Sequence, residues 1–161
     1  MKSVILAAIM VASALEGSSA SDQPLPTIDS MDMTASVGTC RFVNVAGILF
    51  SNNDDTWILP KERHGIPPYV FVSAARGNAD PLTTGWMQLD GVKREVHLAS
   101  RERKGKLTFI DYDVRGAPDY EVDFTLRDPE KKWELTTRTG SIIVTSKGKR
   151  RMIDIFGMDC Q

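Results

Sequence analysis

The stretch Lys106–Arg127, KLTFIDYDVRGAPDYEVDFTLR, decides the fold class of this chain. Apolar and polar residues alternate on both sides of a central segment, Arg115–Asp119, which contains a glycine and a proline. An alternation of period two is typical of a β-strand with one buried side and one side facing solvent. We therefore predict two antiparallel strands joined across Arg115–Asp119. The residues expected on their core side are Tyr112, Val114, Tyr120, Val122 and Phe124.

The polar side of the same hairpin is acidic, with carboxylates at Asp111, Asp113, Asp119, Glu121 and Asp123. Calcium prefers several oxygen ligands, but a calcium loop counted from Asp111 would have Arg115 and Val122 at ligand positions. Paired carboxylates also suit glycoside hydrolysis, which needs one of them protonated through burial. An open sheet face is solvated, so the pattern favours an acidic surface over a metal or catalytic site.

Further strand-like stretches recur after Cys40, separated by turn signals, and no amphipathic helix is expected among them. The Asp90-Gly91 dipeptide is the strongest hairpin signal in the chain. The other expected turns are Ser100–Gly105, Asp128–Lys131, Thr139-Gly140 and Lys147–Arg150. The expected strands besides the hairpin are 40–50, 57–59, 69–75, 86–89, 92–99, 133–138, 141–146 and 151–156. We predict an all-β, single antiparallel sandwich or barrel of about eight or nine strands, largely a meander from Trp86 onward.

The N-terminal residues have the anatomy of a secretory signal peptide. Lys2 precedes the apolar run Val4–Leu15, and Ser18-Ser19-Ala20 offers small residues for cleavage. The run is too short to span a bilayer, so we expect an exported, periplasmic or secreted protein without a membrane anchor. We assign residues 1–20 to the signal peptide, 21–36 to a flexible linker and 37–161 to the β-domain.

The cysteines are Cys40 and Cys160, near the two ends of the predicted domain. In an oxidising compartment an even pair is most simply a disulfide. A catalytic or metal-binding thiol is the alternative, but neither cysteine has a suitable partner nearby in sequence.

Two other features carry reactive or charged side chains. The loop Pro60–Tyr69 combines His64, rigid prolines and Tyr69, and it is a candidate binding loop. The basic clusters Arg101–Lys106 and Lys147–Arg151 coincide with expected turns. If both turns lay at one end of the barrel, they would form a cationic patch opposite the acidic face.

Formal charge and missing motifs limit the function classes. The net charge of −1 gives no general attraction to nucleic acid or to an anionic membrane. The chain has no Gly-x-Ser-x-Gly elbow and no phosphate-cradling glycine loop, and two histidines cannot build a three-histidine zinc site. We expect no cofactor and no resident metal, and we favour a binding protein over an enzyme.

The favoured function is therefore non-catalytic binding of a protein partner, as an inhibitor or immunity-type protein. The expected binding surface comprises Asp111, Asp113, Asp119, Glu121, Asp123, His64 and Tyr69. Two alternatives stay open: a small-molecule or calcium-binding barrel, and an exported hydrolase that uses an acidic pair.

Overall fold

The computed structural model describes residues 24–31, 40–47, 49–50, 57–58, 69–74, 79–132 and 135–158. Its elements are β1 (Ile28–Asp29), β2 (Arg41–Asn44), the 3₁₀ turn η1 (Val45–Gly47), β3 (Leu49–Phe50), β4 (Trp57–Ile58), β5 (Tyr69–Ser73), β6 (Thr84–Leu89), β7 (Val92–Lys104), β8 (Leu107–Val114), β9 (Tyr120–Arg127), β10 (Glu130–Lys132), β11 (Leu135–Ser146) and β12 (Lys149–Met158). The leader, His64 and Cys160 lie outside the described residues.

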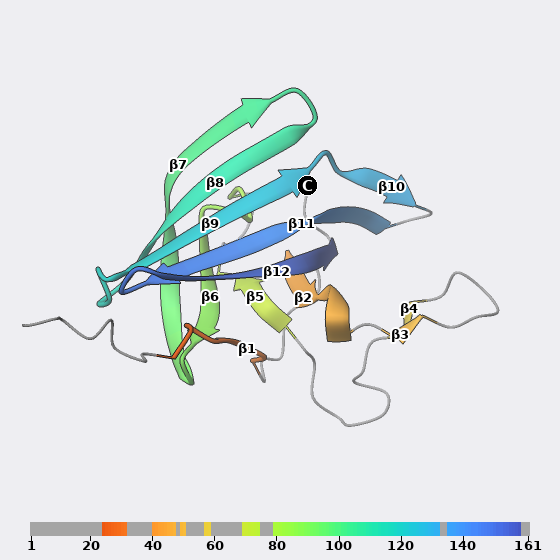
Figure 1. Cartoon of the computed structure of the whole chain (residues 1–161). Helices are drawn as coiled ribbons and strands as arrows, with labels where there is room; N and C mark the ends of the chain where they lie inside the picture. Colours follow the sequence, from red (N-terminus) through yellow and green to blue (C-terminus); the bar gives the residue numbers. More distant parts are fainter. Residues whose placement is uncertain are drawn as a thin grey trace, which may run out of the picture.

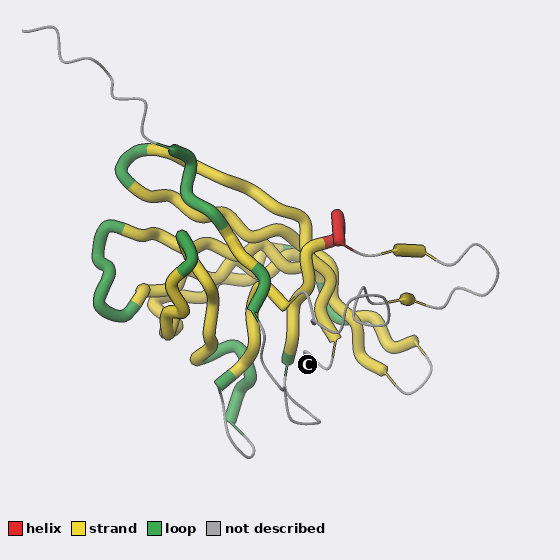
Figure 2. Tube along the Cα trace, turned by 90° about the horizontal axis from the view of Figure 1, so that it is seen from below, coloured by secondary structure: helices red, strands yellow, loops and turns green. Residues whose placement is uncertain are grey.

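Eight of the strands close into an antiparallel barrel. From β6 the chain runs as a meander through β7, β8, β9, β11 and β12, and β2 and β5 then complete the circuit back to β6. β1 pairs with β6 and β10 pairs with β11 outside this ring, and β3 pairs with β4 in a separate small sheet. Figures 1 and 2 show the strands curving around one core. The predictions of an all-β antiparallel domain and of a meander from Trp86 onward are confirmed.

The inside of the barrel is filled by aromatic side chains. Phe42, Phe71, Tyr112 and Phe124 are almost completely buried, and their ring centroids lie 5.0–5.8 Å apart, mostly edge to face. Aromatic rings prefer this arrangement, and it fills the space that a wider barrel would leave for a ligand. The predicted core residues Tyr112, Val114, Val122 and Phe124 are buried, whereas Tyr120 is only partly buried, at the rim.

A second apolar cluster lies outside the barrel wall, against the segment 24–31. Its buried members are Met31, Val43, Tyr69, Val72 and Phe156. The N–H of Met31 donates a 2.8 Å hydrogen bond to the carbonyl of Tyr69, and β1 pairs with the end of β6. Residues 24–31 belong to the segment that we expected to be a flexible linker, and the structure places them against the barrel.

Two expected turns are strand in the structure, and a third, Asp128–Lys131, does not reverse the chain, because its second half belongs to β10, which pairs antiparallel with β11 as β9 does. β7 continues through Ser100–Lys104, so the turn is only Gly105-Lys106. β11 runs unbroken through Thr139-Gly140. The glycine at position 140 allows close packing and does not mark a turn, since a Cβ there would lie 2.1 Å from the carbonyl oxygen of Thr125 on β9. The charged residues of Ser100–Lys104 therefore reflect solvent exposure and Gly140 reflects close packing, and neither marks a reversal of the chain.

The alternation of the meander separates the two basic clusters. The β7–β8 turn lies at one end of the barrel, and the β11–β12 turn lies beside the β8–β9 turn at the other end (Figure 1). The cationic patch that a common end would have produced is therefore not formed. We call the end with the β8–β9 and β11–β12 turns the turn end, and the end with the β7–β8 turn the flared end.

Candidate functional site

The acidic residues of the central hairpin pair with one another across β8 and β9. Asp111 stands directly opposite Asp123, and Asp113 stands directly opposite Glu121. Directly opposite residues share a face of the sheet, and the core residues Tyr112 and Val122 occupy the other face. The four carboxylates therefore form one outward-facing block, which we call the acidic face.

The acidic face is electrostatically unfavourable. Within the described part of the chain, none of its four carboxylates makes an ion pair, since the ion pairs found there involve other residues. Partial burial, followed by the charges of Asp111 and Glu121, raises the pKa of Asp123 above its ordinary value, while Arg150 opposes this shift. We expected a fully solvated face without such burial, and Asp123 departs from that expectation because it is only partly exposed.

An apolar strip borders the acidic face on the side of β11 and β12. Ile143 is the cross-strand neighbour of Asp123, and Met152 is the neighbour of Ile143. Met152 exposes 63% of its surface, more than any other large hydrophobic residue in the described part of the chain. On the other side, Ser100 donates a hydrogen bond to Asp111. Charge and exposed apolar surface are thus adjacent on a rigid sheet.

Not all predicted surface residues join this face. Asp119 is exposed in the β8–β9 turn. Tyr69 is 5% exposed at the start of β5, where it packs in the outer apolar cluster with the Arg41 guanidinium 5.8 Å from its ring centroid. Tyr69 therefore belongs to the packing of the barrel wall, whereas the position of His64 lies outside the described residues.

The described ends of the domain meet beside Cys40. Cys40 is fully buried immediately before β2, and Arg41 pairs with Met158 on β12. Cys160 follows Met158 by two residues in sequence.

Within the described ranges, no group of three or more histidine, cysteine, aspartate or glutamate side chains is placed to hold a metal ion. The carboxylates of the acidic face are spread along two extended strands, which gives a block of charge and not a convergent shell.

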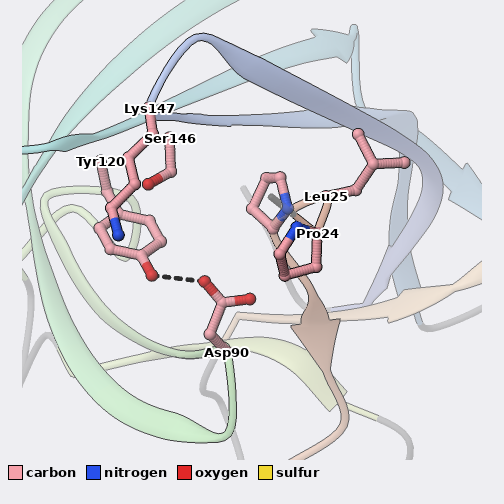
Figure 3. A pocket seen from close by; sticks show the side chains of 7 residues that line it. Pro24, Leu25, Asp90, Tyr120, Ser146 and Lys147 are labelled. Carbon is pink, nitrogen blue, oxygen red and sulfur yellow. Dashed lines mark hydrogen bonds between the residues drawn. The ribbon is translucent and has the colours of Figure 1, made fainter. Parts of the chain in front are cut away.

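The turn end of the barrel carries a pocket of about 330 Å³ (Figure 3). Its wall combines the N-terminal segment with three barrel turns, and the lining residues are Pro24, Leu25, Pro26, Asp90, Tyr120, Ser146 and Lys147. Only the folded meander brings these turns together with residues 24–26, and no sequence motif indicated the pocket.

Hydrogen bonds to Asp90 hold the floor of this pocket. Its carboxylate accepts hydrogen bonds from the Tyr120 hydroxyl and the Thr27 N–H, and the second of these is 2.6 Å long. Partial burial alone would raise the pKa of Asp90, but these hydrogen bonds and the Arg94 charge bring it below its ordinary value. The hydrogen bond to Asp90 in turn raises the pKa of Tyr120.

Comparison with protein families, with curated proteins and with solved structures found no match. None of the described residues belongs to a helix long and apolar enough to cross a membrane.

Proposed function

We propose that this chain is an exported, non-catalytic binding protein whose acidic face recognises a basic surface of a protein partner, as an inhibitor or immunity-type protein would. The observation that carries the proposal is the presence of two pairs of directly opposed carboxylates, Asp111 with Asp123 and Asp113 with Glu121.

Like charges directly opposite each other destabilise a sheet, so the chain loses stability by keeping four of them together. A partner that supplies lysine or arginine side chains would remove this repulsion when it binds. Complementary charge would also speed and orient the encounter.

The adjacent apolar strip supports recognition of a protein rather than of a free cation. Protein interfaces combine a small apolar centre with polar surroundings, and methionine is enriched in them. Met152 and Ile143 lie at the border of the acidic face and supply such a centre.

Export of the chain and a disulfide between Cys40 and Cys160 are parts of the same proposal. The leader sequence supports export. The pairing of Arg41 with Met158 supports a bond between the residue before β2 and the segment that follows its neighbour β12.

Affinity capture from the exported fraction of the native cell tests this function. The wild-type domain is compared with Asp111→Asn/Asp123→Asn and with Glu102→Gln/Glu130→Gln, a control that removes the same charge at exposed positions outside the acidic face. We expect a basic protein to be enriched by the wild type and by the control, and lost by the Asn variant. Recovery of no specific protein at physiological salt, or equal recovery by all three, would contradict the proposal.

A second candidate function rests on the pocket at the turn end. Its lining combines the apolar residues Pro24, Leu25 and Pro26 with the polar residues Tyr120, Ser146 and Lys147, and this combination is suited to a small amphipathic molecule. Saturable chemical-shift changes confined to these residues in a small-molecule screen would favour this candidate over the protein partner.

A further inference from the structure

Three arginines share the inward-facing side of the flared end. Arg101 stands opposite the buried Ile110, and Arg103 stands opposite the buried Thr108. On β11, Arg138 lies two residues before Gly140, which pairs with the buried Leu126. Since residues two apart on a strand share a face, all three side chains extend from the rim of the core.

Two carboxylates compensate two of these arginines. Asp80 accepts a hydrogen bond from Arg101 and is held in the β5–β6 connection by the N–H of Leu82 at 2.8 Å. Both oxygens of Asp128 accept hydrogen bonds from Nη2 of Arg103, at 2.9 and 3.0 Å. The cluster thus contains three guanidinium groups and two carboxylates, both of them engaged.

Arg138 is the uncompensated member. It is only partly exposed, and its Nε is buried with no hydrogen-bond acceptor among the described residues. Burial, followed by the charge of Arg101, lowers the pKa of Arg138, although Asp128 and Asp80 act in the opposite direction. A buried polar atom without a partner is rare and costs free energy, and the cost is larger when the group is charged.

We propose that the flared end is a binding site for one oxyanion group, a phosphate or a carboxylate of a small molecule, held by Arg138 with Arg101 and Arg103. A guanidinium group presents planar, paired donors that match the oxygens of either group. The cluster carries one net positive charge, which a bound carboxylate would neutralise and a phosphate would more than neutralise. The site is separate from the acidic face, because the arginines belong to the inward-facing side of β7 and β11, whereas the acidic face lies on the outward side of β8 and β9.

The experiment titrates the whole exported chain with inorganic phosphate and with citrate, each against sodium chloride at equal ionic strength. Binding is followed by thermal shift and by the side-chain Nε–Hε resonances of arginine. The variants are Arg138→Gln, Arg138→Lys, and Arg151→Gln, which removes an exposed arginine from β12.

We expect a saturable rise in melting temperature with at least one of the two anions for the wild type and Arg151→Gln. Binding should be at least roughly tenfold weaker for Arg138→Lys, because lysine keeps the charge but loses the paired donors, and absent for Arg138→Gln. A response to phosphate alone identifies a phosphate site, and a response to citrate alone identifies a carboxylate site. Arg138→Gln should fold at least as stably as the wild type without anion, because it removes a partly buried guanidinium group whose Nε has no acceptor.

The proposal is overturned if neither anion shifts the melting temperature beyond sodium chloride, or if Arg138→Gln responds like the wild type. If Arg138→Gln does not fold, Arg138→Lys alone decides, and unchanged affinity in that variant overturns the proposal.

Discussion

The hydroxyl of Tyr112 donates a 2.7 Å hydrogen bond to the carbonyl oxygen of Leu82 inside the barrel. Leu82 belongs to the β5–β6 connection and is 1% exposed, so this bond ties the connection to the aromatic core. Burial raises the pKa of the Tyr112 hydroxyl, which therefore remains protonated and able to donate.

Replacement of Tyr112 by Phe should destabilise the fold by about 1–3 kcal/mol, because the Leu82 carbonyl loses its donor in a buried place. The measurement is the free energy of unfolding in urea. Ser100→Ala, which removes an exposed hydroxyl hydrogen-bonded to Asp111, is the control and should cost less. Equal stability of Tyr112→Phe and the wild type would mean that water or another donor replaces the hydroxyl.

The hydrogen bond from Tyr120 to Asp90 should stabilise the fold only between an acid limit, set by Asp90, and an alkaline limit, set by Tyr120. The pKa of Asp90 is lowered in the folded state. Its contribution to the free energy of unfolding is therefore present above the ordinary pKa of about 3.9 and is lost as pH falls through the pKa of the folded state. The pKa of Tyr120 is raised, so its contribution is present below about 10 and is lost as pH rises through the folded pKa.

Tyr120→Phe should therefore lower the stability by at most about 1 kcal/mol near neutral pH, because the pair is largely exposed. The difference from the wild type should shrink in strong acid and in strong base. Stability curves of both proteins across pH measure this difference. Asp90→Asn should remove the acid limit and weaken the alkaline one, because Asp90 is the main cause of the raised pKa of Tyr120. A difference that stays constant from pH 2 to 12 is incompatible with this account.

The proposed disulfide predicts a large response to reduction. A bond between Cys40 and Cys160 would close a loop of about 120 residues and restrict the unfolded chain by roughly 4–5 kcal/mol in the entropic model. The melting temperature should fall in reducing agent, and Cys40→Ser/Cys160→Ser should match the reduced wild type. An unchanged melting temperature on reduction would exclude the bond.

The like-charge pair of Asp111 and Asp123 predicts a gain in stability when one charge is removed. Asp123→Asn should raise the free energy of unfolding by roughly 0.2–1 kcal/mol at neutral pH. The raised pKa of Asp123 means that the carboxyl favours the folded state below its ordinary pKa, and that this contribution disappears as pH rises through the folded pKa. The gain of the variant should therefore vanish below about pH 3.9.

Asp119→Asn is the control for this gain, because it removes one carboxylate from the exposed β8–β9 turn without a directly opposite partner on β8. Equal stabilisation by both variants would show that net charge, and not the cross-strand pairing, is responsible.

Alternation in the sequence was sufficient to predict the strands and the core of the central hairpin. It placed Tyr112, Val122 and Phe124 inside because each strand has one dry side, and it placed the acidic residues together on the other side. The meander followed from the short connections between successive strands.

Other parts of the fold depend on contacts that are distant in sequence. Tyr69 begins an expected strand, but it was also assigned to the candidate binding loop, because Met31, which packs with it in the outer apolar cluster, lies far away in the chain. The charged residues Arg101 and Arg103 suggested a turn, but they continue strand β7 as exposed side chains on its core-facing side, at an end of the barrel that forms only when the strands pair. The pocket at the turn end and the surroundings of Arg138 also depend on residues that are distant in sequence, so no local pattern predicted them.

The measurement that tests the central claim most directly is the dissociation constant of the captured basic partner for three purified proteins. These are the wild type, Asp111→Asn/Asp123→Asn and Glu102→Gln/Glu130→Gln, compared at physiological salt. We predict that the Asn variant is more stable than the wild type but binds at least roughly tenfold more weakly, while the control stays within about twofold. Undiminished affinity of the more stable Asn variant would show that the acidic face is not the binding surface.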